Sequence, residues 1–201
     1  MKYTLLTYKG FEPSMIGAML SYGKTSFEDL RDFPNIRPEL LDRFGELSKK
    51  LVAAGVGHDK FLEQIQYWIG IQAPLYFWKQ FDTYRIGVSK SSESTMHKSW
   101  KNGLTLDMFE QPIYQETLDK LNANIREYLS DLTDERRKKA LFGIIVGNLP
   151  DGYLQTRLVN INGKSLRNIY LQRKNHKLAE WRDFCDWLKR LPYGDLITLE
   201  K

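Results

Sequence analysis

Two groups of polar residues in this sequence have side chains that could bind an anion or a nucleotide. The first group lies between residues 80 and 95 and contains only hydrogen-bonding side chains: Gln80, Arg85, Ser91, Ser92, Ser94 and Thr95. An arginine combined with small hydroxyl donors can hold a phosphate group or a pyrimidine carbonyl. A solvated loop that follows a helix explains the same pattern, and the spacing alone favours that interpretation.

The second group lies between Asn162 and His176, where Asn-Gly-Lys-Ser-Leu-Arg-Asn is followed by Arg173. If this stretch is a helix, Lys164, Asn168 and Arg173 lie near one face, because offsets of four and nine residues return close to the same side. An amide such as Asn168 within an apolar run needs hydrogen-bond partners if it is half-buried. A polar helix face exposed to water is an equally good interpretation.

Several common kinds of site are absent from the sequence. No glycine-rich phosphate loop stands between a strand and a helix, because Gly143 and Gly147 do not have that spacing. The histidines are scattered, and none has a carboxylate at metal-ligand spacing, so no metal site is predicted. They are His58, which we expect to be a solvated loop residue, His97 and His176.

The 201 residues have the composition of one globular domain that spans residues 1–201, with 42% hydrophobic and 27% charged residues. The single cysteine, Cys185, excludes an internal disulfide, and its apolar neighbours predict a buried thiol without a chemical role. The sequence shows neither a membrane-spanning run nor a signal-peptide pattern, so we expect a cytoplasmic protein. The net charge of +5 favours an anionic ligand and leaves nucleotides, folates and nucleic acid open.

Hydrophobic periodicity predicts the elements that must position these groups. Helices are predicted at 13–20, 38–54, 114–130 and 133–146, after Pro74, and from 163 towards 191. Strands are predicted at 1–9, 62–71 and 154–160. Ser26, with Asp29 three residues later, and Thr133 are expected to cap helices. Residues 87–100 are expected to form a polar loop, and the tail from Pro192 to be extended. The result is an α+β fold with a small antiparallel sheet flanked by helices.

Both polar groups also match, in order, the motifs of a known family. Ala73-Pro74 precedes an aromatic helix that ends in Gln80, and Thr83-Tyr84-Arg85 stands where the family has Arg-His-Arg. Ser94 takes the place of the signature serine, and Leu62-Glu63-Gln64 stands where the family has Phe-Glu-His. The stretch 162–168 matches Asn-x-Arg-Ser-Leu-x-Asn, and Gln172-Arg173 and Ala179-Glu180-Trp181 follow it. On these residues, the chain resembles the flavin-dependent thymidylate synthase (ThyX) family along most of its length.

The resemblance implies the roles of individual residues. It implies that FAD is bound by Gln64, Tyr84, Arg85, Asn162, Lys164, Asn168, Arg173 and His176. It implies that a pyrimidine nucleotide is bound by Gln80, Ser92, Glu93, Ser94, Thr95 and Arg173. Arg85, Ser94 and Arg173 are the residues that it implies to be catalytic.

The chain departs from the family at three arginines that hold the nucleotide, because Thr83, Met96 and Val146 stand in those places. A charge-assisted hydrogen bond contributes roughly 1.5–3 kcal/mol, so their loss predicts much weaker binding of dUMP. Three neighbouring lysines are the available substitutes: Lys79, Lys90 and Lys98. A flexible ammonium group does not provide the bidentate fork of a guanidinium.

Two functions follow from the resemblance. The first is FAD-assisted C5 methylation of dUMP or a related pyrimidine nucleotide, with methylenetetrahydrofolate and NADPH as co-substrates, in a homotetramer with sites at subunit interfaces. The alternative is a non-catalytic relative that keeps the fold as a module for assembly or for binding nucleotide or nucleic acid. The positive charge is consistent with both functions.

Overall fold

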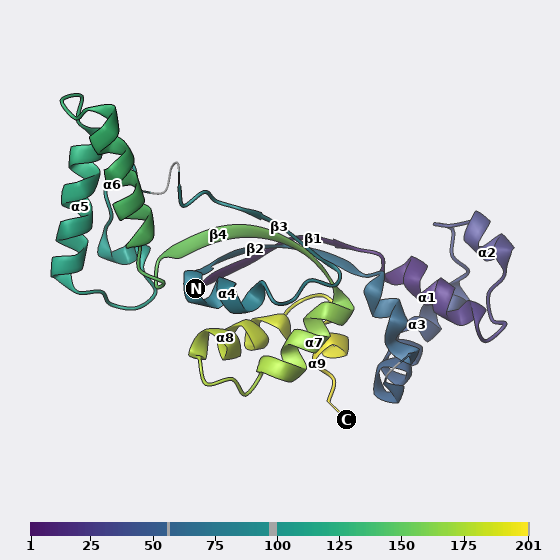
Figure 1. The fold of residues 1–201 in the computed structure, drawn as a ribbon. Helices are drawn as coiled ribbons and strands as arrows, with labels where there is room; N and C mark the ends of the chain where they lie inside the picture. Colours follow the sequence, from purple (N-terminus) through teal and green to yellow (C-terminus); the bar gives the residue numbers. More distant parts are fainter. Residues whose placement is uncertain (56, 97–99, 201) are drawn as a thin grey trace. The chain divides into compact units, whose positions relative to one another are not determined.

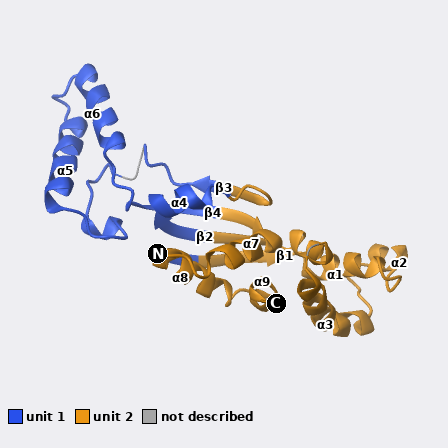
Figure 2. Cartoon of the chain, turned by 60° about the horizontal axis from the view of Figure 1, so that its bottom comes forward, with its two compact units in different colours: residues 1–3, 70–83, 90–158 blue, residues 4–69, 84–89, 159–201 orange. Residues whose placement is uncertain are grey.

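The computed structural model describes residues 1–55, 57–96 and 100–200. His97 and Lys98, two residues considered above, lie outside the described part. The chain divides into two compact units (Figure 2). Unit 1 contains residues 1–3, 70–83 and 90–158, and unit 2 contains residues 4–69, 84–89 and 159–201. No helix in the described ranges is long and apolar enough to cross a membrane.

Four strands form one antiparallel sheet in the order β1-β2-β4-β3 (Figure 1). They are β1 (Lys2–Lys9), β2 (Gln66–Pro74), β3 (Val88–Ser92) and β4 (Leu154–Asn162). The backbone N–H of Gly163 bonds Ile65, and that of Leu75 bonds Tyr153, so β2 and β4 run in opposite directions. The α+β prediction with a small antiparallel sheet is confirmed, and the strand at residues 1–9 is the edge strand that was expected.

Two predictions for the strands were wrong. Residues 87–100 were expected to be a loop, but Val88–Ser92 form β3. This lysine- and serine-rich segment has low strand propensity, and pairing with β4 overrides it, through bonds from Asn162 to Gly87 and from Glu93 to Thr156. The strand expected from Leu62 begins only at Gln66, because His58–Glu63 form a 3₁₀ helix, η1.

The helices of unit 2 are α1 (Phe11–Leu20), α2 (Phe27–Arg31), α3 (Pro38–Ala54), α7 (Gly163–Arg173), α8 (Ala179–Leu188) and α9 (Gly194–Thr198). The bounds predicted for α3 are confirmed, and so is the capping box formed by Ser26 and Asp29. The helix predicted from residue 163 ends at Arg173 and restarts at Ala179. The tail was expected to be extended, which was wrong, because Gly194–Thr198 form α9.

Helix α9 is fixed by a buried arginine of α7. Arg167 is only 5% exposed, and its Nη1 donates hydrogen bonds to three backbone carbonyls, those of Leu196, Ile197 and Leu199. Burial lowers the pKa of the guanidinium, and the charge of Asp59 opposes that shift. Arg167 is therefore buried in this helix, whereas its neighbour Asn168 is exposed.

Unit 1 contains the helices α4 (Leu75–Phe81), η2 (Leu106–Met108), α5 (Gln115–Leu129) and α6 (Glu135–Gly147). Helices α5 and α6 pack side by side as a hairpin (Figure 1). Their core includes Trp100, Phe109, Leu121, Ile125 and Ile145. The cap of α6 is Asp134, whose carboxylate accepts from the N–H of Arg137, and not Thr133 as predicted. The Thr133 hydroxyl instead donates to the carbonyl of Glu127.

Candidate functional site

An arginine and a tyrosine form the centre of a polar cluster in unit 2. Arg173, at the end of α7, donates from Nε to the hydroxyl of Tyr84 over 2.8 Å. The same hydroxyl donates to Oε1 of Gln172 over 3.0 Å. The guanidinium carbon of Arg173 also lies 4.9 Å from the ring centroid of Trp181. Arg173 is half-buried, so the hydrogen bond and the aromatic ring hold its cation in one orientation beside solvent.

His176 lies at the edge of this cluster. Its ring packs edge-on against Trp181 with the centroids 6.4 Å apart, and its Nδ1 accepts from the N–H of Leu178. Burial and then the nearby positive charges of Arg173, Lys177 and Arg182 lower the pKa of His176. The imidazole is therefore neutral at neutral pH and leaves the positive charge of the cluster to the arginines.

Two further predicted cofactor residues are exposed and available to a ligand. The side chains of Arg85, next to Tyr84, and Asn168, on α7, make no hydrogen bond or ion pair with any residue that the structure describes. Their polar groups face water, so a ligand would gain their hydrogen bonds without first breaking others.

Two other predicted cofactor residues have structural roles. Asn162 is buried, and its Oδ1 caps α7 by accepting from the N–H of Ser165 over 2.8 Å. Gly87 lies against this amide with φ +65°, and a Cβ there would come within 2.0 Å of Nδ2. Lys164 forms an ion pair with Asp59, whose side chain is only 5% exposed. Neither the Asn162 carboxamide oxygen nor the Lys164 ammonium is free for a ligand in this arrangement.

Gln64, the remaining cofactor residue, lines a cavity of about 360 Å³ between α1, α3 and η1. The polar residues that share this cavity include His58, Lys60, Tyr22 and Ser21. His58 is exposed, as expected, but it is the first residue of η1 and not a loop residue, and it lines this cavity together with Lys60 and hydroxyl groups. No pattern in the sequence marks Lys60, Tyr22 or Ser21 as site residues, because only the folded chain brings α1 next to η1. The volume is within the range of small-molecule sites.

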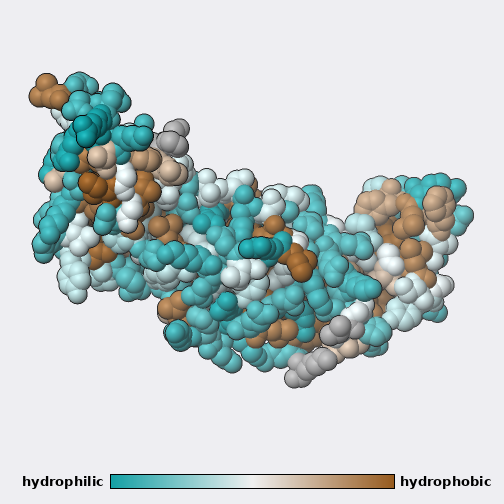
Figure 3. Space-filling model, in the orientation of Figure 1, coloured by the Kyte–Doolittle hydropathy of each residue, from teal (hydrophilic) through white to brown (hydrophobic). Residues whose placement is uncertain are grey.

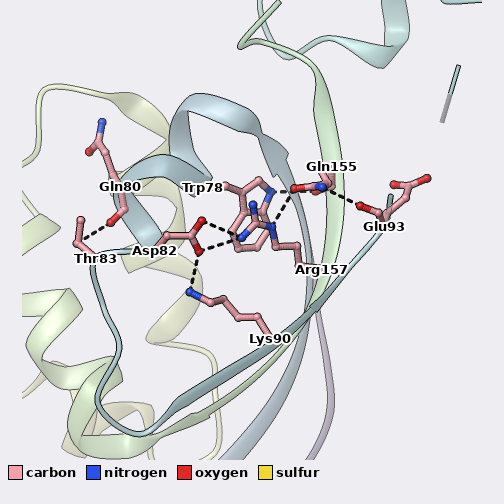
Figure 4. Close-up of polar contacts among 8 residues, drawn as sticks. All are labelled: Trp78, Gln80, Asp82, Thr83, Lys90, Glu93, Gln155 and Arg157. Atoms are coloured by element: carbon pink, nitrogen blue, oxygen red, sulfur yellow. Dashed lines mark hydrogen bonds and ion pairs between the residues drawn. The ribbon is translucent and has the colours of Figure 1, made fainter. Parts of the chain in front are cut away.

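The predicted substrate residues Gln80 and Ser92 to Thr95 belong to unit 1. The backbone of Glu93 is fixed to β4, since its N–H donates to Thr156 and its carbonyl accepts from Nε2 of Gln155. Oγ of Ser94 accepts from the N–H of Met96, and the carbonyl of Thr95 accepts from the indole of Trp100. The amide of Gln80 points away from the ion-pair cluster of this unit (Figure 4).

That cluster joins Asp82 to two cations (Figure 4). Nζ of Lys90 lies 2.7 Å from Oδ1 of Asp82, and Nη1 of Arg157 donates to both carboxylate oxygens. The Arg157 guanidinium also lies 4.3 Å from the ring centroid of Trp78. Burial raises the pKa of Asp82, but hydrogen bonds from Lys90 and Arg157 outweigh burial, so the pKa is below the ordinary aspartate value. One carboxylate thus pairs with both cations, which leaves the three side chains with one net positive charge.

Comparison with solved structures decides the fold. No protein-family model matches the chain, and no curated protein sequence does. The crystal structure of flavin-dependent thymidylate synthase ThyX from Helicobacter pylori complexed with FAD and dUMP is similar over 100% of this chain and 98% of its own, with a TM-score of 0.67 and 15% identity. A second structure of Helicobacter pylori ThyX with FAD and dUMP has a TM-score of 0.70 and 14% identity over the same shares.

This chain has the ThyX fold. The structural similarity covers the full length of this chain. The residues that the resemblance assigns to FAD belong to unit 2, and Gln80 and Ser92 to Thr95 belong to unit 1.

Thr83, Met96 and Val146 are the residues that the sequence resemblance matches with three arginines of the family. Thr83 is exposed and donates to the carbonyl of Gln80, Met96 is exposed, and Val146 is half-buried on α6. Of the substitute lysines, Lys79 bonds both carboxylate oxygens of Asp151, at 2.8 and 2.6 Å, and Lys90 bonds Asp82. Lys98 lies outside the described residues. The two described lysines would have to leave a carboxylate to bind phosphate.

Proposed function

We propose that this protein binds FAD and uses it to methylate C5 of a pyrimidine nucleotide, dUMP or a close relative. The observation that carries the proposal is the hydrogen bond by which the Tyr84 hydroxyl orients half-buried Arg173, with exposed Arg85 next to Tyr84 in the sequence. The ThyX fold and its solved examples with FAD and dUMP support the same assignment.

The residues of unit 2 fit a flavin. Arg85 and Asn168 offer hydrogen bonds that the described chain leaves unused, and Arg173 offers an oriented cation. Gln64, His58 and Lys60 line a cavity in the same unit, where an ammonium group and an imidazole suit the phosphates of a dinucleotide. Bound flavin supplies hydride, and these residues orient the ring and its phosphates and place positive charge beside them. Asn162 and Lys164 act indirectly, because they hold α7 and η1 in place.

The part of the proposed site that binds the nucleotide is expected to bind its ligand more weakly than the part that binds the flavin. Gln80 and Ser94 offer an amide and a hydroxyl to the pyrimidine, and methylenetetrahydrofolate and NADPH are the co-substrates. With Thr83, Met96 and Val146 in place of arginines, each missing charge-assisted bond costs roughly 1.5–3 kcal/mol of binding. We therefore propose a low affinity for dUMP, or a preference for a nucleotide with less charge. The proposal includes a cytoplasmic homotetramer with sites at subunit interfaces.

The experiment is a titration of the purified protein with FAD, followed by visible absorbance and flavin fluorescence. Wild-type protein should bind FAD, and Arg85→Ala should bind it about tenfold or more weakly at unchanged thermal stability, because Arg85 is exposed and pairs with no described residue. Arg190→Ala is the matched control, since Arg190 is another exposed arginine of unit 2 whose side chain pairs with no described residue. A wild-type protein that binds no FAD would refute the proposal.

The second candidate is a non-catalytic protein that binds a nucleotide or nucleic acid, or serves assembly. The observation that favours a loss of catalysis is that Lys79, Lys90 and Arg157, cations of unit 1, are all paired with carboxylates and so do not replace the family's phosphate-holding arginines. A thermal-shift comparison of FAD, dUMP and single-stranded DNA separates the two functions. Stabilisation by DNA alone favours the second candidate, and stabilisation by FAD favours the enzyme.

A further inference from the structure

Helix α2 in unit 2 exposes apolar side chains although it is well ordered by local bonds. None of its residues is buried. Phe27 is 71% exposed, Leu30 is 42% exposed, and Phe33, just after the helix, is 43% exposed. On an ordinary surface, exposed apolar side chains are scattered singly, whereas here three large ones lie within seven residues of sequence.

The conformation of α2 is fixed at its N-terminus. The carboxylate of Asp29 accepts from the N–H of Ser26 over 2.8 Å, which completes a capping box. Arg37 then binds both oxygens of Asp29, from Nε at 2.8 Å and Nη2 at 3.1 Å. The apolar side chains are therefore presented on a defined backbone, as in a surface that binds a partner.

The same unit contains a groove of about 290 Å³ between α1 and α3 that complements α2. Its floor is apolar, formed by Met19 and Leu47, and its wall includes the ring of Tyr22. Lys24 and Arg43 stand at its rim, and neither forms an ion pair with a residue in the described ranges. The third cation, Lys50, is already paired with Glu46 on the next turn of α3.

Charge identifies the occupant that suits this groove. Helix α2 carries Glu28 beside Phe27 and Leu30, and the Glu28 carboxylate accepts only from the hydroxyl of Ser26 among described side chains. Hydrogen bonding to Ser26 lowers the pKa of Glu28, so it is ionised at neutral pH. An apolar, acidic helix and an apolar, basic groove on one chain are complementary between two copies of that chain.

We propose that α2 of one copy docks in the Met19–Leu47 groove of a second copy, with Phe27 and Leu30 on the apolar floor and Glu28 towards Lys24 and Arg43. Two copies related by a two-fold axis make this contact twice, since each supplies a helix and a groove. Space-filling Figure 3 shows hydrophobic side chains gathered over the α1–α2–α3 part of unit 2. Tyr22 lines both the groove and the cavity that contains Gln64, so the second copy would lie beside the proposed flavin site.

Light scattering of the full chain over a range of concentrations tests this contact. Wild-type protein should have a mass of at least two chains, and Phe27→Ser should weaken assembly by about tenfold or more while the circular dichroism spectrum stays unchanged. Leu132→Ser is the matched control, because Leu132 is 98% exposed on unit 1. It should leave assembly unaffected.

A charge exchange makes the test specific for this pairing. Arg43→Glu and Glu28→Arg should each assemble less tightly than wild type, and an equimolar mixture of the two should recover assembly between the unlike copies. Wild-type protein that stays monomeric overturns the proposal, even if α2 captures another protein. It is equally overturned if Phe27→Ser assembles like wild type, or if the mixture recovers nothing. None of these readouts depends on FAD.

Discussion

Nε of Arg173 donates a hydrogen bond to the hydroxyl of Tyr84 over 2.8 Å, across 89 positions of sequence. The contact joins the two polar groups found in the sequence, one around residue 85 and one on α7. The sequence resemblance to ThyX matches Tyr84 with the histidine of the signature, and in this chain the phenol hydroxyl orients Arg173. The pair also provides the first prediction.

Tyr84→Phe should loosen Arg173 without removing its charge. The substitution deletes one bond from Arg173 and one to Gln172, so we expect a loss of roughly 1 kcal/mol of stability and a weakening of FAD binding by several-fold. Urea denaturation and FAD titration measure the two effects. Tyr114→Phe is the control, because Tyr114 is 86% exposed. If Tyr84→Phe binds FAD as wild type does, Tyr84 does not position Arg173 for the flavin.

Removal of Lys164 should destabilise the fold more than removal of Asp59. Asp59 is buried, its Oδ1 has no hydrogen-bond partner, and Lys164 is its ion-pair partner. Lys164→Ala would leave a buried carboxylate without that partner, at a cost of about 3–5 kcal/mol. After Asp59→Ala, the Lys164 ammonium can reach water, because its side chain is 24% exposed. Denaturation midpoints compare the two variants, and the reverse order would contradict this account.

Asp82 should make the stability of the protein depend on pH. Its pKa is lowered in the folded state, so the stability that it contributes is fully present above the unfolded value of about 4. That contribution is lost as pH falls through the lower folded pKa. At neutral pH, the free energy of unfolding of wild type should exceed that of Asp82→Asn by no more than about 1 kcal/mol, since the Asp82 side chain is 44% exposed. The difference should disappear in acid.

Urea denaturation of wild type and Asp82→Asn at neutral and acidic pH measures this effect. Asp131→Asn is the control, because Asp131 is exposed and forms no ion pair within the described chain. If the difference in free energy of unfolding between wild type and Asp82→Asn grows as pH falls, the proposed role of Asp82 is wrong.

Cys185 should be unreactive until the protein unfolds. It is 2% exposed on α8, and burial raises the pKa of its thiol to about 12. Because the thiolate is the reactive form, Ellman's reagent at about pH 8 should label native protein very slowly and denatured protein at once. As the chain has one cysteine, the signal reports α8 alone. Rapid labelling of native protein would show that α8 opens readily.

Local patterns in the sequence were sufficient for much of the fold. The bounds of α3, the capping box of Ser26 and Asp29, and the burial of Cys185 were all predicted correctly. Each depends on residues within a few positions of one another. The cap of α6 was misplaced by one residue because Thr133 and Asp134 are both good caps, and only the folded backbone selects Asp134.

Contacts between distant segments decided the rest. β3 forms from a polar segment because β4 supplies its hydrogen-bond partners, and α9 forms where Arg167 supplies donors for its carbonyls. The sequence by itself determined which residue types are available at the candidate site, including Arg85, Arg173 and the missing arginines. Only the tertiary structure decided which of these side chains are paired with another residue, because pairing depends on proximity in space. Lys164 is bound to Asp59, 105 positions away, whereas the exposed side chain of Arg85 pairs with no residue in the described ranges.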